Sequence, residues 1–284
     1  QDFTWDGNSK INLVVLSSSV SIISYSPKEK DIKIVLLPAE TYLDVAGGFG
    51  KWKIESVYSL GESENPPQGI KFLSDSLSQF LGVPIDGYLK LDRTLKNKNA
   101  TQLINYLRQN KINFLKLKFS SSSNLNDWEL YRLMVGIDSV RFDKIEEVNL
   151  EDEYLQDSIL PDQTKAKLAD PERIEILSGK LFADATINKE QLSIAIFNAT
   201  QTPGKAQKAA RLISNLGGNV IFEKNAQTQN LKNSMVLTNS SAKSYTFNRL
   251  KMLFAKNCQN CDIVDEVVQK SRAQINLVLG EDFK

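Results

Sequence analysis

Residues 21–44, SIISYSPKEKDIKIVLLPAETYLD, contain the pattern that decides the first half of the fold. An apolar run from Val20 to Tyr25 is followed by a polar segment over 26–31, which Pro27 opens, and then by a second apolar run over 32–37. Apolar runs of this length around a Pro-containing polar turn predict two strands that form a hairpin. Residues 11–16 form another apolar run just before them and predict a further strand.

Downstream of this hairpin, strand-like and helix-like patterns alternate. Leu103, Ile104 and Leu107 recur at helical spacing, and 128–136 resembles a short amphipathic helix. The segments 83–91 and 112–119 have the pattern of strands. We therefore expect an α/β domain over 1–150, with a mixed sheet flanked by helices and an apolar groove.

The second half of the chain divides into two regions by composition. Residues 151–186 begin inside an acidic stretch over 146–157, contain two prolines and predict a charged, partly helical connector. Residues 187–284 show the order strand–helix–strand–strand–helix–strand. This order predicts a small split-βαβ, ferredoxin-like domain whose helices cover one face of its sheet.

Composition excludes several classes of chemistry. The 284 residues include 35 basic and 34 acidic side chains, so the net charge of +1 gives no field that would attract nucleic acid. The chain has no histidine, which excludes a Ser–His–Asp triad, an imidazole base and a zinc site with His ligands. No apolar run approaches the ~18 residues of a membrane-spanning helix.

Two stretches together resemble the LytR-CpsA-Psr family of bacterial cell-envelope proteins. The first is the segment 21–44 with KWKIESVY at 51–58 and LGVPIDGYLKLD at 81–92. The second is LSIAIFNATQTPGKAQKAARLISNLGGNV at 192–220 with the closing INLVLGEDF at 275–283, which is similar to the accessory LytR C-terminal domain. The resemblance covers most of the chain, and 100–157 fits it least.

The resemblance implies an extracytoplasmic phosphotransferase that moves a glycopolymer from a polyprenyl-phosphate carrier onto peptidoglycan. In such a site arginines hold a pyrophosphate, acidic residues bind Mg²⁺, and an apolar tunnel holds the lipid. The first residue is Gln1 rather than Met, and we expect a membrane anchor in a segment that precedes it. Peptidoglycan and envelope proteins are the partners that the resemblance implies.

The sequence departs from the family at positions that carry charge. Ala39 and Glu40 stand where the family has Arg-Asp, and 17–19 are serines where it has Arg-Ser-Asp. The arginine-rich segment has its nearest counterpart in 126–132, which keeps a single arginine. We therefore expect a degraded site with weak or no catalysis, and the alternative is a non-catalytic cell-wall binding or scaffold protein.

Five residues are the candidates for that site. The resemblance assigns Glu40 and Arg132 to catalysis, and Lys53, Asp92 and Arg93 to ligand binding; no metal ligand is assigned, and Mg²⁺ is implied by the family alone. Each has a structural alternative. In these alternatives Glu40 is a solvated loop carboxylate, Lys53 begins an exposed helix, and Asp92 and Arg93 form a surface ion pair. Arg132, between Leu130 and Leu133, is then a residue of a predicted helix without a ligand contact.

Cys258 and Cys261 are the only cysteines. They follow a predicted helix, whereas the reactive pair of a thioredoxin-like protein opens one. A structural disulfide in an oxidising compartment and two unreactive thiols are the alternatives.

Overall fold

A computed structural model of the chain describes residues 4–64, 66–92, 95–109, 113–160, 163–227, 230–238, 244–255 and 271–283. Contacts divide it into two compact units, a larger one over Asp2–Leu81 and Ile85–Leu181 and a smaller one over Gly82–Pro84 and Phe182–Lys284. Each unit is described by itself. The domain limits expected at 150/151 and 186/187 stay predictions.

The core of the larger unit is a six-stranded mixed sheet, sheet A. Its strand order is β7-β6-β1-β2-β3-β8. The strands are β1 (Ile11–Leu16), β2 (Val20–Ser26), β3 (Asp31–Leu37), β6 (Gly87–Leu91), β7 (Ser121–Ser123) and β8 (Ile145–Asn149). β1, β3, β6 and β8 run parallel to one another, whereas β2 and β7 run the other way. The β2–β3 hairpin expected from residues 21–37 is confirmed, with Val20 opposite Leu37.

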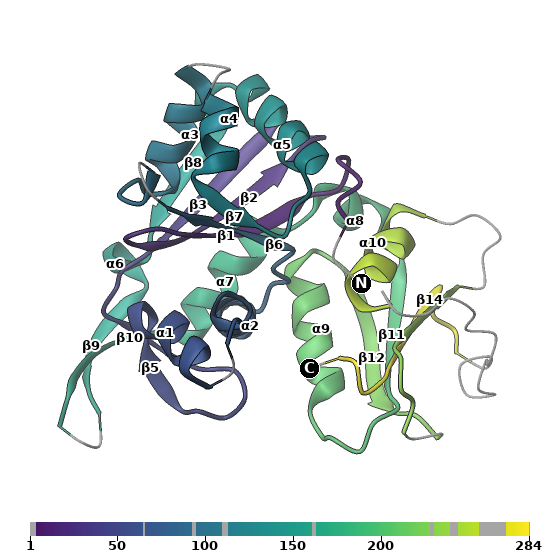
Figure 1. The fold of residues 1–284 in the computed structure, drawn as a ribbon. Helices are drawn as coiled ribbons and strands as arrows, with labels where there is room; N and C mark the ends of the chain where they lie inside the picture. Colours follow the sequence, from purple (N-terminus) through teal and green to yellow (C-terminus); the bar gives the residue numbers. More distant parts are fainter. Residues whose placement is uncertain are drawn as a thin grey trace. The chain divides into compact units, whose positions relative to one another are not determined.

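Helices cover both faces of sheet A, which explains why every residue of β2 is buried. Figure 1 shows α3, α4 and α5 on one side of the sheet and α7 on the other. The helices are α3 (Ala100–Gln109), α4 (Asn113–Phe119), α5 (Asp127–Ser139) and α7 (Pro171–Phe182). A short 3₁₀ helix, η2 (Phe142–Lys144), links α5 to β8.

The strand expected over 112–119 is wrong, because residues 113–119 form α4. The alternation of Leu115, Lys116, Leu117 and Lys118 fits a strand as well as a short helix. In a segment of seven residues, periodicity cannot separate the two. The helix packs against α3 and α5, and Leu117 is its buried apolar side chain among the described residues.

A second sheet, sheet B, completes the larger unit with the strand order β5-β4-β10-β9. Its strands are β4 (Thr41–Asp44), β5 (Lys51–Lys53), β9 (Leu155–Ile159) and β10 (Lys165–Ala169). Three helices join or flank them: α1 (Ile54–Glu64), α2 (Gly69–Leu81) and α6 (Leu150–Glu153). Sheet B is thus built from the residues after β3 and the residues after β8.

The smaller unit contains sheet C, with the order β12-β11-β14-β13. Its elements are α8 (Ala185–Glu190), β11 (Ser193–Asn198), α9 (Lys205–Asn215), β12 (Asn219–Asn225), β13 (Met235–Thr238), α10 (Tyr245–Phe254) and β14 (Ile275–Leu279). Side chains of α9 and α10 share one apolar core with one face of the sheet.

The α/β class with mixed sheets and flanking helices is confirmed, and so is the order of elements in the smaller unit. The split-βαβ, ferredoxin-like arrangement is not observed. β11 pairs directly with β12 in parallel, so no strand lies between the two strands that α9 connects. Strand order depends on pairing between distant segments, which the local pattern of 187–284 does not specify.

Candidate functional site

The carboxyl ends of the four parallel strands of sheet A meet at one edge. Leu16 at the end of β1 is opposite Lys90 of β6, and Leu36 of β3 is opposite Asn149 of β8. The segments that leave this edge are 17–19, 38–40, 92 and 150–153. Ligands of open α/β sheets bind at such carboxyl edges. We call this region the carboxyl edge.

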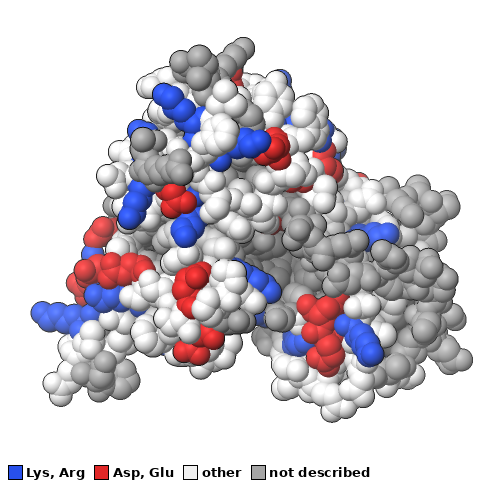
Figure 2. All heavy atoms as spheres, viewed as in Figure 1, with Lys and Arg blue, Asp and Glu red and all other residues white. Residues whose placement is uncertain are grey.

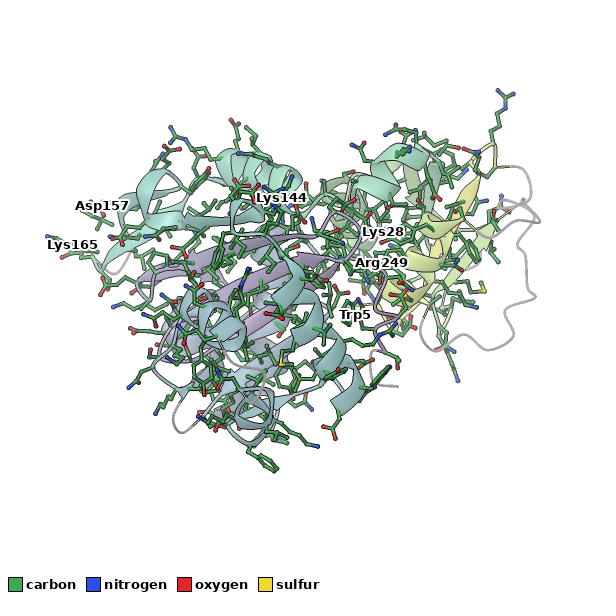
Figure 3. All side chains as sticks on the ribbon, turned by 90° about the horizontal axis from the view of Figure 1, so that it is seen from above. Trp5, Lys28, Lys144, Asp157, Lys165 and Arg249 are labelled. Atoms are coloured by element: carbon green, nitrogen blue, oxygen red, sulfur yellow. The ribbon has the colours of Figure 1, made fainter. Side chains whose placement is uncertain are left out.

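Glu40 lies at the carboxyl edge, exposed, between β3 and β4. The next residue, Thr41, is opposite Lys167 of β10. A hydrogen bond between the Lys167 ammonium and the Glu151 carboxylate raises the pKa of Lys167, and the charges of Asp157 and Glu40 add to this effect. Lys167 is therefore a cation beside Glu40, but its ammonium already has a carboxylate partner. Figure 3 shows Asp157, with Lys165, on the β9–β10 hairpin.

A second cation, the ammonium group of Lys90, contacts the side chain of Tyr58. Its Nζ donates to the Tyr58 Oη at 2.8 Å and lies 4.8 Å from the centroid of the Tyr58 ring. This hydrogen bond raises the pKa of Lys90 against the effect of burial, and the charges of Asp92 and Glu62 act in the same direction. Lys90 therefore stays cationic at neutral pH at the end of β6.

An apolar cavity lies between sheet A and the layer of α3, α4 and α5. Its free space is small, about 10 Å³, which is close to what one water molecule needs. Its lining is apolar throughout: Leu13, Ile23 and Leu89 from the sheet, and Leu103, Ile104, Leu107, Leu117, Leu130, Leu133, Met134 and Ile137 from the helices. Such a lining suits a hydrocarbon chain, because a polar group there would lose its hydrogen bonds to water.

The cavity and the Lys90–Tyr58 pair are on opposite faces of sheet A. Leu89 lines the cavity, and side chains alternate along a strand, so Lys90 points to the other face. There its ammonium meets Tyr58, which belongs to α1. One face of β6 therefore lines the apolar cavity, and the other face carries the Lys90 ammonium.

The structure does not bring the two predicted catalytic residues together. Arg132 is on α5, and its Nη1 donates to the Asp6 carbonyl at 3.0 Å. Asp6 precedes the first residue of β1, at the amino end of that strand, whereas Glu40 follows the carboxyl end of β3. Arg132 therefore ties down the N-terminal segment at the edge opposite the candidate site.

The other predicted site residues are more scattered. Lys53 is half-buried at the end of β5 and pairs with Tyr42, which places it on the other face of sheet B from Lys167. Asp92 is exposed directly after β6, and its backbone N–H donates to the Ser120 carbonyl at 2.8 Å. Arg93, Cys258 and Cys261 lie outside the described residues.

The serines at 17–19 supply no carboxylate to a Mg²⁺ site at the carboxyl edge. The Ser17 hydroxyl donates to the Ser19 carbonyl at 3.1 Å and accepts from the Ser19 N–H at 3.2 Å. Both hydrogen bonds stabilise the turn over 17–19. Within the described part of the chain, no three His, Cys, Asp or Glu side chains gather as a metal site. Figure 2 shows acidic and basic side chains interspersed on the visible face of the larger unit.

Lys90 and Lys167 were not among the residues that sequence reasoning selected. The signal for Lys90 was its place in GYLKLD, where it directly precedes a candidate strand end. Lys167 carried no such signal, because its proximity to Glu40 depends on the pairing of β10 with β4. In the described residues, no helix is long and apolar enough to cross a bilayer.

Comparison with known proteins finds a match over the first third of the chain. Residues 10–97 match the model of the LytR_cpsA_psr family. A polyisoprenyl-teichoic acid–peptidoglycan teichoic acid transferase, TagU, from Halalkalibacterium halodurans is 28% identical over 91 residues, which are 32% of this chain and 26% of the relative. TagU from Bacillus mycoides is 29% identical over 76 residues, 27% of this chain and 23% of the relative. The match spans about a quarter of the length of these relatives.

Among solved structures, B. subtilis TagV is similar over 61% of this chain and 96% of its own. The sequence identity is 16% and the TM-score is 0.46.

Proposed function

We propose that the chain is a member of the LytR_cpsA_psr family, whose model matches residues 10–97, and that it takes part in attaching polyprenyl-linked glycopolymers to peptidoglycan at the bacterial cell envelope. The TagU relatives are named for the transfer of polyisoprenyl-linked teichoic acid to peptidoglycan. An extracytoplasmic location and a membrane anchor outside residues 1–284 are part of the proposal and rest on family membership alone.

One observation carries the proposal: the apolar cavity between sheet A and α3–α5. A polyprenyl chain is a long hydrocarbon that must leave a bilayer to be handled by a protein. Burial of such a chain is favoured by roughly 25 cal/mol per Å² of apolar surface removed from water. In our proposal α3–α5 move away from sheet A to admit this chain, because the lining has the right chemistry but the closed cavity has only about 10 Å³ of free space.

The proposal includes weak or absent phosphotransferase activity. Ala39 stands at the carboxyl edge where the family has an arginine, and the nearby ammonium groups of Lys90 and Lys167 are bonded to Tyr58 and Glu151. Removing one donor that stabilises transition-state charge commonly costs about 10²–10³ in rate. The same arrangement supports the alternative function, a non-catalytic binding or scaffold protein at the cell wall.

The first test fills the cavity. Met134 lines it and is 7% exposed, so Met134→Trp occupies the space that the chain would need. We expect binding of undecaprenyl phosphate in detergent to weaken at least about tenfold. Met235→Trp is the matched control, since Met235 is equally buried in the smaller unit. Equal affinities of the parent and Met134→Trp, with both folded by circular dichroism, would contradict carrier binding in the cavity.

The second test measures catalysis with a polyprenyl-pyrophosphate glycan and peptidoglycan fragments, with and without Mg²⁺. We expect turnover at least about 10²-fold below that of an intact relative assayed in parallel. Turnover comparable to that of the intact relative would contradict our proposal of weak or absent catalysis. Carrier binding without turnover would favour the scaffold alternative.

A further inference from the structure

The segment before β1 is bound to α5, the helix that supplies more of the cavity lining than any other element. We call residues 4–9 the N-terminal strap. Trp5 is 3% exposed and lies beside α5 (Figure 3), and its backbone N–H donates to Glu129 Oε1 at 2.6 Å. One turn further along the helix, Arg132 Nη1 donates to the Asp6 carbonyl at 3.0 Å. The strap is therefore attached to the first two turns of α5.

Hydrogen bonds within the strap give it a defined conformation. Asp6 Oδ1 accepts from the Ser9 N–H at 2.8 Å and from the Ser9 hydroxyl at 2.7 Å. The Trp5 ring donates from Nε1 to the Ser9 carbonyl at 2.8 Å. Because these bonds join Trp5 to the turn that follows it, the strap holds or leaves α5 as one unit.

The Trp5 ring also packs against sheet A. Its centroid is 6.2 Å from that of the Tyr25 ring, and the two rings meet edge to face. Tyr25 is two residues from Ile23 on β2, so its side chain faces the helical layer, as the cavity lining does. The Tyr25 hydroxyl lies directly against Gly136 of α5, where a Cβ would be 2.2 Å from the oxygen. Trp5 thus contacts the helix and the strand residue against which that helix packs.

α5 has to move if the cavity is to admit a hydrocarbon chain. The free space of about 10 Å³ is close to that of one water molecule, whereas a single isoprene unit has five carbon atoms. The cavity-lining residues of α5 are Leu130, Leu133, Met134 and Ile137. The two helix residues that the strap contacts, Glu129 and Arg132, each directly precede one of them. Since the strap leads into β1 of sheet A, α5 cannot move away from the sheet at this end without leaving the strap.

We propose that the N-terminal strap is a latch, which keeps α5 closed over the cavity and releases it before a hydrocarbon chain enters. The hydrogen bond from Trp5 to the Glu129 carboxylate is buried, so its release leaves two polar groups to be satisfied again by water. Release also returns the apolar ring of Trp5 to water, which is unfavourable. The closed state keeps the apolar lining out of solvent when no chain is bound. The identity of the chain, a polyprenyl carrier, rests on the proposed function, whereas the hold on α5 does not.

A latch differs from an ordinary stabilising contact in the sign of its effect on binding. Loss of a structural contact leaves the affinity for a ligand unchanged or lowers it. Loss of a latch raises the population of the open state, and the apparent affinity rises in proportion to that population. Stability and carrier binding should therefore change in opposite directions when the strap is weakened.

The test compares Trp5→Ala with the parent in two measurements. Without carrier, the backbone amides of α5 should exchange with deuterium at least about fivefold faster than in the parent, and faster than those of β2 in the same protein. With undecaprenyl phosphate in detergent, the apparent affinity should rise by a similar factor, about fivefold. Arg132→Ala is a control, because it removes one exposed hydrogen bond and leaves Trp5 in place, so carrier affinity should stay at the parental value.

Gly7→Ala keeps the proposal testable if Trp5→Ala does not fold. Gly7 has a φ of +74°, and a Cβ there would be 2.5 Å from the Arg132 guanidinium carbon, so the substitution strains the strap and leaves the Trp5 ring intact. Carrier affinity should rise about threefold. Gly48→Ala is the matched control. Gly48 has a φ of +81°, and an added Cβ would have nothing within 4 Å among the described residues beyond its chain neighbours.

Unchanged exchange of α5 in the strap variants overturns the latch. So does faster exchange with a carrier affinity at or below the parental value, because release would then not limit entry. An equal rise in affinity for Gly7→Ala and Gly48→Ala overturns it as well. If α5 exchanges faster but neither the parent nor any variant binds undecaprenyl phosphate, the result contradicts the proposed function alone and supports the hold of the strap on α5.

Discussion

The Arg132 guanidinium donates a hydrogen bond to the Asp6 carbonyl, with 3.0 Å between Nη1 and the oxygen. The contact joins α5 to the segment before β1 and lies at the amino end of that strand. Gly7 allows the close approach, because a Cβ at this residue would be 2.5 Å from the guanidinium carbon, and its φ of +74° also favours glycine. Arg132 thus has a structural role at the amino end of β1, away from Glu40 and the carboxyl edge.

Arg132→Ala should therefore lower stability slightly and leave carrier binding intact. One exposed hydrogen bond to a carbonyl contributes about 1 kcal/mol to the free energy of unfolding. Urea denaturation measures this loss, and undecaprenyl phosphate binding measures function. Arg141→Ala is the control, since Arg141 is an exposed arginine that pairs only locally with Asp143. Carrier affinity that falls tenfold at unchanged stability would restore Arg132 to the site.

Glu129 should matter more for stability than its position on a helix implies. Its two carboxylate oxygens accept from Trp5 N at 2.6 Å and Asn126 N at 2.8 Å, and the Asn126 side chain accepts from Glu129 N in return. Glu129→Ala removes one half of this capping box and leaves two N–H groups without acceptors, which costs about 2 kcal/mol.

The control for that substitution is Asp127→Ala in the same helical turn. Asp127 is exposed and pairs with Lys118, so its loss should cost less than about 0.5 kcal/mol. Thermal unfolding of both variants beside the parent gives the comparison. A Glu129→Ala variant as stable as Asp127→Ala would show that water replaces the carboxylate.

The sequence indicated those parts of the fold that depend on neighbouring residues. The β2–β3 hairpin follows from Pro27 and the polar turn around it, and α3 follows from the spacing of Leu103 and Leu107. The parallel pairing of β11 with β12 was missed because it joins distant segments. For residues 113–119 the sequence fits the period of a strand and that of a helix, so only tertiary packing determines that they form α4.

The candidate site shows the same limit. Glu40 at a strand end was indicated by its place after the apolar run of β3. The partners of the two lysines depend on tertiary contacts. Tyr58 is 32 residues from Lys90 in sequence, and Glu151 is 16 residues from Lys167. A pattern search along one chain cannot find such pairs.

The Lys33–Glu146 ion pair should make stability depend on pH in a defined window. A hydrogen bond from Lys33, at 2.8 Å, is the largest cause that lowers the pKa of Glu146 below 4.5. Burial alone would lower the pKa of Lys33, but the bonds to Glu146 and the charge of Asp31 raise it above 10.5. Stability from Glu146 is lost as pH falls through its folded-state pKa, and stability from Lys33 is lost as pH rises through its own.

The measurement is the difference in unfolding free energy between the parent and Lys33→Met. Both groups are partly exposed, so we expect about 0.5–1 kcal/mol at pH 7 and less than half of it near pH 3. Lys180→Met is the control: Lys180 is 3.7 Å from the same carboxylate and far more exposed, and the loss should be smaller. A difference that is the same at both pH values would mean that packing of the Lys33 stem, not charge, is what the variant removes.

Ala39→Arg should restore part of the activity if missing charge is what limits it. Ala39 is exposed at the carboxyl edge beside Glu40, so a longer side chain fits without repacking. A guanidinium at this position can bind a diphosphate through two hydrogen bonds, and one such donor changes rates by about 10²–10³ in other enzymes. Because the other family charges stay absent, we expect a rise of about tenfold in turnover of a polyprenyl-pyrophosphate glycan. Ala39→Gln, of similar length and without charge, is the control and should stay at the parental rate. Equal rates for the two variants would mean that other missing groups limit the reaction, and a complete absence of turnover in both would favour the scaffold function.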